Sequence, residues 1–343
     1  MIKKVLQKLT VKEDLTAEEV YDLIVAIKND QLNPAQIAGF QVALLMKGPT
    51  LTEITAIAQA MRDHCIRIDP RVDEELMDTC GTGGGLSTFN ISTAVAFVAA
   101  AAGIPVAKHG SRSIASLSGS ADVLEALNVE INISPEGVEK LIEEVGIAFL
   151  YAPLFHPVMG KVLPPEKDLG IKTIFYTIIG PLINPSRASR HVLGVYKPEL
   201  LDTVAQVAAS IGYQKALFVH GLDGLDEISL LGKTRINELN NGEITTYEIA
   251  PEDFGLSRCT LKEIATGTPE ENATMIRDVF AGRDKGPRRQ AVVLNAAGAL
   301  MIGERAASFK EGIELANELI DSGAARRKLD DLIVASHAYK MVI

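Results

Sequence analysis

The chain of 343 residues contains no tryptophan, only three cysteines, and few aromatic residues, which make up 5% of it. Cys65, Cys80 and Cys259 are far apart and form no CxxC pair, so the sequence indicates neither a zinc site nor a disulfide framework. Cys80 adjoins a glycine-rich stretch, and it is either a reactive thiol or a small buried residue at the end of a strand.

The sequence also lacks long apolar runs and an excess of positive charge. The amino-terminal segment has no long apolar region, and the apolar run at 94–102 is too short to cross a bilayer. We therefore expect a cytoplasmic protein that makes no membrane contact. The net charge of −10 argues against binding to nucleic acid. An anionic substrate would have to be held by local backbone dipoles, a few basic residues or a metal ion.

The capping pattern near the amino terminus predicts a small helical domain over residues 1–70. Segments 16–19, 33–36 and 50–53 each place a capping residue three positions before Glu or Gln, and Pro34 falls at a first helical position. Apolar residues then recur at helical spacing. We expect part of 160–190 to join this domain.

Residues 71–343 predict an α/β domain built around a central, mostly parallel sheet. Short apolar strands at 105–108, 147–151 and 216–220 alternate with segments of helical pattern. Asn240-Asn241-Gly242 is typical of a hairpin tip. The fold class is thus α/β, with a small all-helical domain.

The glycine-rich stretch at 78–93 is the strongest local signal. Glycines from Gly81 to Gly85 are followed by the helix start Asn90-Ile-Ser-Thr93. Glycine lets backbone N–H groups approach a ligand closely, and a helix start offers unpaired N–H groups with partial positive charge. Together they predict an anion site, most plausibly for phosphate.

Two further segments supply polar side chains. Lys108 and Arg112 follow a predicted strand, so they should face the anion site beside the hydroxyl-rich turn at 116–122. Asp226-Glu227 follows another strand and suits Mg²⁺, although a solvated acidic turn is the commoner fate of such a pair. None of the histidines has a partner at zinc or triad spacing.

At these motifs the chain resembles the anthranilate phosphoribosyltransferase family, which is related to the pyrimidine-nucleoside phosphorylases. The resemblance runs over nearly the whole length. Its further motifs are Gln36-Ile-Ala-Gly-Phe, Met46-Lys-Gly48, Lys108-His-Gly110, Ser118-Gly-Ser-Ala-Asp122, Gly180-Pro-Leu-Ile-Asn-Pro185, Asp226-Glu-Ile-Ser229 and Asn295-Ala-Ala. It implies a homodimer that uses Mg²⁺ and the donor 5-phosphoribosyl 1-pyrophosphate (PRPP), with anthranilate as acceptor in tryptophan biosynthesis.

By motif match, the resemblance also implies the site residues. PRPP would contact Gly81, Thr82, Gly83, Gly84, Gly85, Thr88, Asn90, Ile91, Ser92, Thr93, Lys108, Arg112, Ser113, Ser116, Ser118, Gly119 and Ser120. Mg²⁺ would be bound by Ser92, Asp226 and Glu227, directly or through water. The acceptor pocket would consist of Gly81, His109, Gly110, Ser111, His156 and Glu166. His109 and His156 are equally compatible with a structural hydrogen-bonding role.

Three departures from the family pattern concern the site. The glycine stretch is one residue short and lacks its usual Asp; Ser111 replaces an Asn, and Glu166 replaces an Arg that would grip the acceptor carboxylate. A carboxylate facing that group would repel it. The sequence therefore leaves three hypotheses: anthranilate transfer, a PRPP-dependent paralogue with a different aromatic acceptor, and, ranked last, a nucleic-acid-binding relative that is not an enzyme.

Overall fold

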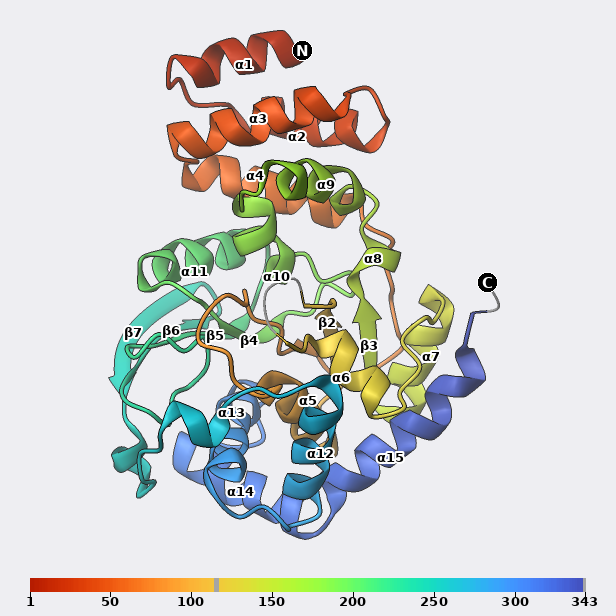
Figure 1. The fold of residues 1–343 in the computed structure, drawn as a ribbon, viewed down its shortest axis with the longest axis vertical. Helices are drawn as coiled ribbons and strands as arrows, with labels where there is room; N and C mark the ends of the chain where they lie inside the picture. The colour runs from red at the N-terminus through yellow and green to blue at the C-terminus, as the bar shows by residue number, and fades with distance from the viewer. Residues whose placement is uncertain (114–116, 342–343) are drawn as a thin grey trace.

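The computed structural model describes residues 1–113 and 117–341, and it stacks a layer of helices on a larger α/β body (Figure 1). The amino-terminal helices are α1 (Ile2–Thr10), α2 (Ala17–Lys28), α3 (Pro34–Lys47) and α4 (Leu51–Asp63). Thr16, Asn33 and Thr50 each form the capping box that the sequence predicts, with Glu19, Gln36 and Glu53. Each box satisfies N–H groups that a helix start leaves unpaired.

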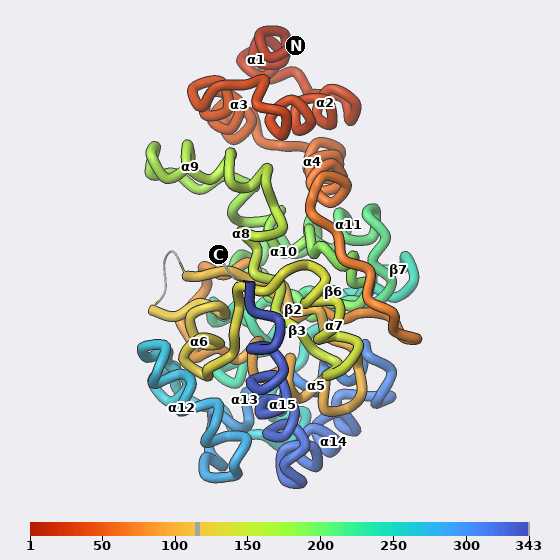
Figure 2. Tube along the Cα trace, turned by 90° about the vertical axis from the view of Figure 1, so that its right-hand side faces the viewer, coloured from red at the N-terminus to blue at the C-terminus, as the bar shows by residue number. Residues whose placement is uncertain are grey.

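A helix from the middle of the chain joins this layer. Helix α9 (Met159–Leu169) packs against α3, while the chain passes between the layers through the short helices α8 (Ala152–Phe155) and α10 (Gly180–Leu182) (Figure 2). Ile66 N–H donates to Phe155 O, and Ile68 N–H donates to Pro185 O, so the connecting segments run side by side. A π-helical turn, Phe175–Ile179, lies just before α10.

The α/β body is built on one seven-stranded sheet in the order β3-β2-β1-β4-β5-β6-β7. The strands are β1 (Met77–Asp78), β2 (Val106–Gly110), β3 (Ile147–Tyr151), β4 (Arg190–Gly194), β5 (Lys215–Gly221), β6 (Thr234–Asn240) and β7 (Glu243–Ile249). Strands β1 to β5 pair with one another in parallel, whereas β6 is antiparallel to both β5 and β7. From β1 the chain adds β2 and β3 on one side, and from β4 it adds β5, β6 and β7 on the other. The topological switch of the sheet therefore lies between β1 and β4.

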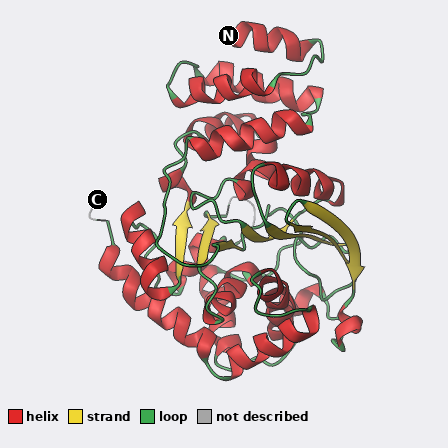
Figure 3. Cartoon of the chain, turned by 180° about the vertical axis from the view of Figure 1, so that it is seen from behind, coloured by secondary structure: helices red, strands yellow, loops and turns green. Residues whose placement is uncertain are grey.

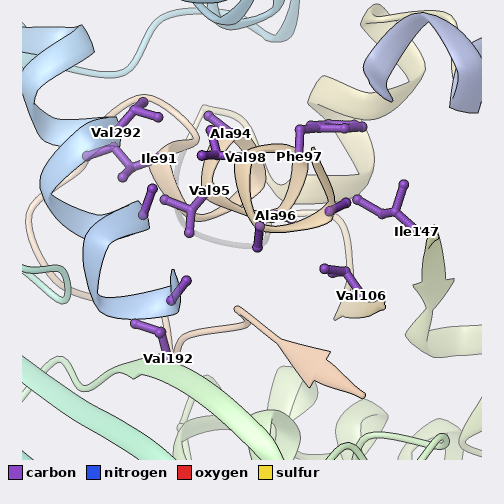
Figure 4. Close-up of a cluster of buried hydrophobic side chains, with 14 of the residues drawn as sticks. Ile91, Ala94, Val95, Ala96, Phe97, Val98, Val106, Ile147, Val192 and Val292 are labelled. Carbon is purple, nitrogen blue, oxygen red and sulfur yellow. The ribbon is translucent and has the colours of Figure 1, made fainter. Parts of the chain in front are cut away.

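Helices cover one face of this sheet in a thick layer (Figure 3). They are α5 (Ile91–Ala101), α6 (Ser120–Ala126), α7 (Pro135–Val145), α12 (Pro269–Phe280), α13 (Pro287–Ile302), α14 (Phe309–Asp321) and α15 (Ala324–Ser336). Helix α5 is buried on nearly all sides, and Figure 4 shows Val95 and Ala96 among side chains of the strands and of α13. This helix therefore gives the glycine-rich stretch a rigid base.

The opposite face of the sheet meets α11 (Leu201–Ser210) and the helical layer. Along β4 successive side chains alternate, so Val192 packs in the core around α5 while Leu193 packs in the other core. That second core contains residues of α1 to α4 together with residues of α11, β4 and β5. The two layers thus share one continuous apolar core.

The remaining elements are short. Residues Asn241 and Gly242 both have positive φ between β6 and β7, which confirms the predicted hairpin tip. Short 3₁₀ turns complete the chain: Pro198–Leu200, Pro251–Phe254, Leu261–Ile264 and His337–Tyr339. Within the described ranges, none of the helices has the length and apolar character needed to span a bilayer.

Candidate functional site

Three loops meet where the carboxyl ends of the parallel strands reach the switch point. The glycine-rich loop follows β1, the Lys108–Gly110 segment ends β2, and the acidic loop around Asp226 follows β5. Lys108 Nζ lies 3.5 Å from Ser92 Oγ at the start of α5. The Lys108 side chain therefore faces the start of α5.

The first half of the glycine-rich loop is fastened to the strand end of β4. Thr82 N–H donates to Gly194 O at 2.9 Å, and Tyr196 N–H donates to Thr82 Oγ1 at 3.0 Å. Gly83 and Gly84 follow with φ of +61° and +94°, and both are exposed. Only glycine adopts such angles without strain, so the loop turns here with its backbone open to a ligand.

The second half of the loop packs directly on the acidic loop. A Cβ atom on Gly85 would lie 2.5 Å from Asp226 Oδ1, and one on Gly194 would lie 1.7 Å from Asp226 O. The Gly85 backbone also interacts electrostatically with the Asp226 carboxylate. The missing side chains at Gly85 and Gly194 are thus what lets the acidic loop reach the glycine-rich loop.

The predicted metal ligands come together at this contact. The Glu227 carboxylate lies within electrostatic range of the Ser92 backbone and of the Lys108 charge. Burial, together with the Asp226 charge, raises the pKa of Glu227 to about 8, and burial also raises the pKa of Asp226. The Asp226 and Glu227 carboxylates repel each other when both are ionised, and a bound cation would relieve that repulsion. Together with the Ser92 hydroxyl they are oxygen ligands that fit a hard cation such as Mg²⁺.

This donor set is incomplete without a substrate. Among the described residues no group of three or more His, Cys, Asp or Glu side chains is gathered to hold a metal. Mg²⁺ normally takes one or two carboxylates and completes its shell with water and substrate phosphates. The site therefore suits a metal that arrives with a phosphorylated ligand.

Asn90 lies in a hydrogen-bonded cluster at the start of α5. Its Nδ2 donates to Ser118 O at 3.3 Å, and its Oδ1 accepts from Asn272 Nδ2 at 2.8 Å. Thr88 forms an isolated bridge with Ala265, which ties the end of the loop to the segment before α12. These contacts bring Thr88, Asn90 and Ser118 together. In contrast, Ile91 and Thr93 are buried in the core behind them.

The segment after β2 is held by Asp122. The Asp122 carboxylate accepts the N–H groups of Ser113 and Gly119, and Arg112 Nη1 pairs with it at 3.1 Å. Arg112 also pairs with Glu125 and lies over the Tyr151 ring. Arg112 is therefore already partnered by carboxylates on α6. Of the remaining predicted donor residues, Ser120 lies at the start of α6, and Ser116 lies outside the described residues.

Two buried histidines form the centre of the predicted acceptor pocket. His109 Nε2 lies 3.0 Å from His156 Nε2, and each Nδ1 is buried without a hydrogen-bond partner. Burial lowers the pKa of His109 to about 4 and also lowers that of His156, so both rings are neutral near pH 7. Gly110 packs against Ser120, and Ser111 is exposed beside it.

A further residue of the predicted acceptor pocket, Glu166, lies on α9. Its carboxyl group accepts a hydrogen bond from Gln41 Nε2 at 3.1 Å and another from the Thr173 hydroxyl, between α3 and α9. Burial raises its pKa. In the described part of the chain no other predicted acceptor residue contacts this carboxyl group.

Sequence reasoning missed the buried polar residues that hold these loops. Asp78 accepts the N–H groups of Thr79, Cys80 and His109, and Asn184 Nδ2 donates to its other oxygen at 2.7 Å. Asn295 binds both backbone groups of Ile228, just after the acidic pair. Asn184 and Asn295 stand in motifs of the family resemblance, but those motifs gave them no role; a polar residue among apolar neighbours is a further signal.

Comparison with known proteins agrees with this geometry. Residues 3–65 match the model described as "Glycosyl transferase family, helical bundle domain", and residues 73–326 match the model described as "Glycosyl transferase family, a/b domain". A protein of Acetivibrio thermocellus named anthranilate phosphoribosyltransferase is 48% identical over 340 residues, which covers 99% of this chain and 98% of that relative.

Solved structures give the same result. Anthranilate phosphoribosyltransferase from Thermus thermophilus superposes with a TM-score of 0.90 at 40% identity, covering 97% of this chain and 99% of that one. The enzyme from Saccharomyces cerevisiae, solved in complex with PRPP and Mg, has a TM-score of 0.89 at 30% identity, with 98% of each chain covered. The chain therefore belongs to the anthranilate phosphoribosyltransferases of the glycosyl transferase family.

Proposed function

We propose that the protein transfers the ribose 5-phosphate group of PRPP to the amino group of anthranilate, as a step of tryptophan biosynthesis. The bond between ribose C1 and the pyrophosphate oxygen breaks, the amine nitrogen bonds to C1, and pyrophosphate and one amine proton are released. The convergence of the glycine-rich loop, Lys108 and the Asp226–Glu227 pair at the switch point carries this proposal.

The donor half uses groups that stabilise negative charge. Exposed N–H groups around Gly83 and Gly84, the start of α5 and the Lys108 ammonium surround the place where a pyrophosphate would lie. Ser92, Asp226 and Glu227 would hold Mg²⁺, which neutralises charge on the departing pyrophosphate when it is bound. Little covalent chemistry is asked of the protein beyond positioning and electrostatics.

The acceptor half offers neutral groups. His109 and His156 are uncharged and buried next to the carboxyl end of β2, where they can contact an aromatic ring. The Glu166 carboxyl group already accepts hydrogen bonds from Gln41 and Thr173 between α3 and α9, so its oxygens have partners within the protein. This arrangement weakens the reason for a different acceptor, and full-length relatives named for anthranilate do not favour that alternative.

The direct test is the fluorescence of anthranilate. Incubation with PRPP and Mg²⁺ should extinguish it as the product forms, and mass spectrometry should show the added ribose 5-phosphate. If PRPP binds and no anthranilate is consumed at high enzyme concentration, the acceptor assignment is wrong.

We also propose that the enzyme is a cytoplasmic homodimer. Its three cysteines are free thiols, as expected in a reducing compartment. One face of α3 exposes Val42, Leu45 and Met46, the last with 74% of its surface accessible, and such a stripe is typical of a contact surface. Light scattering should give twice the chain mass, and Met46→Glu should reduce that mass. A monomeric wild type would contradict the proposal.

A further inference from the structure

A line of buried side chains leads from the helical layer to the base of the glycine-rich loop. It begins with Arg62 on α4, passes through Tyr213 before β5, and ends with His191 on β4. Arg62, Tyr213 and His191 have at most 5% of their surface exposed. His191 and Leu193 are two residues apart on β4, so their side chains point to the same face of the sheet. The helical layer covers this face.

His191 is bonded to the loop through a single atom. Its Nε2 lies 2.7 Å from Cys80 O, the carbonyl immediately before Gly81. A carbonyl oxygen only accepts hydrogen bonds, so Nε2 carries the ring proton. Burial lowers the pKa of His191, which leaves the ring neutral and its Nδ1 an acceptor. The Tyr213 hydroxyl lies 3.4 Å from this Nδ1 and can donate to it.

The other end of the line is held by the helical layer. The Tyr213 and His191 rings are stacked with centroids 5.7 Å apart and planes 23° apart. The Arg62 guanidinium lies 5.5 Å from the centre of the Tyr213 ring, and its Nη1 donates to Ile211 O at 2.5 Å. Stacking and cation–π contacts of this kind orient the rings that they join.

We propose that His191 and Tyr213 are positioning residues for the donor site, and that Arg62 couples them to the helical layer. Thr82 is fastened to β4 by its own bonds, so the His191 bond sets the carbonyl two residues earlier and with it the path into Gly81. The loop then presents its N–H groups to pyrophosphate without reordering. The inference rests on the proposed function only in taking PRPP as the ligand of this loop.

The first test compares two substitutions of His191 by direct PRPP titration in the presence of Mg²⁺. His191→Leu removes the donor to Cys80 O, and we expect PRPP affinity to fall five- to tenfold, the scale of one hydrogen bond. His191→Gln keeps an N–H donor on a side chain of similar reach, and we expect it to stay within twofold of the wild type. In turnover, His191→Leu should raise the KM for PRPP and leave the KM for anthranilate unchanged.

The second test measures coupling to the helical layer. Arg62→Met should weaken PRPP binding, and the double variant with His191→Leu should be no weaker than His191→Leu alone. Arg289→Met is the matched control, because Arg289 is also buried but pairs with Asp321 on the far face of the sheet. It should lower the melting temperature and leave PRPP affinity unchanged.

The outcomes separate this inference from the proposed function. If PRPP binds and anthranilate is not consumed, the acceptor assignment fails while the titrations still decide the role of His191. Wild-type PRPP affinity in folded His191→Leu, or equal losses in His191→Leu and His191→Gln, would overturn the inference. Should His191→Leu fail to fold, Tyr213→Phe keeps the ring and removes only the hydroxyl. It should then weaken PRPP binding about twofold, and no change would overturn the inference.

Discussion

Gly85→Ala is the sharpest perturbation that the contact between the two loops allows. The new Cβ would lie 2.5 Å from Asp226 Oδ1 and 3.0 Å from its Cγ, whereas ordinary van der Waals contact begins at 3.4 Å. The carboxylate must therefore move by about 0.9 Å or rotate away from the Gly85 backbone. A displacement of this size in a metal ligand set should weaken Mg²⁺ activation ten- to a hundredfold, or about 1.4–2.8 kcal/mol.

The assay is initial rate against Mg²⁺ concentration at saturating PRPP and anthranilate. Gly83→Ala is the control, because its Cβ would meet nothing within 4 Å although its φ of +61° strains any side chain. That strain costs roughly 1–2 kcal/mol of folding stability and leaves Asp226 in place. If both variants need the same Mg²⁺ concentration as the wild type, the argument that Gly85 admits the acidic loop is refuted.

Three further predictions follow from individual contacts. Because burial raises the pKa of Glu166, the folded protein should lose stability as pH rises from the ordinary carboxyl pKa toward the folded value. Glu166→Gln should show less of this loss in thermal melts. Equal slopes of melting temperature against pH in the two proteins would contradict the prediction. Asn272→Ala releases Asn90 and should raise the KM for PRPP several-fold with the KM for anthranilate unchanged, which initial rates will decide. Removal of Mg²⁺ with a chelator should abolish turnover, and Asp226→Asn should then need at least tenfold more Mg²⁺ for half-maximal recovery; turnover that survives chelation would argue against the metal.

Much of the fold could be predicted because its signals are local. The capping residues Thr16, Asn33 and Thr50 begin helices where the pattern places them, and the Asn241-Gly242 turn has the positive φ angles that its residues favour. Strand β1 has only two residues, Met77–Asp78, too few for a periodic pattern. Its place between β2 and β4 depends on long-range pairing that no local sequence encodes.

The residues of the predicted donor site carry local signals of this kind, whereas those of the predicted acceptor site do not. Glycine-rich turns and an Asp-Glu pair after a strand have direct physical meaning, and the contact between Gly85 and Asp226 agrees with it. The surroundings of Glu166 depend on how α9 packs against α3, which its spacing from His156 does not encode. Its role there remains a prediction.

The continuous core beneath the helical layer has a consequence for how this chain can be divided. The two family models meet between residues 65 and 73, yet Leu193, Leu201 and Phe218 of the α/β body pack in the same cluster as Phe40 and Ile57. Cutting the chain at the junction would expose that whole face to water. The amino-terminal helices are therefore no transplantable module: a chimaera with a relative must exchange α11 and the facing side of β4 and β5 together with them, and heat should melt these parts in a single cooperative step.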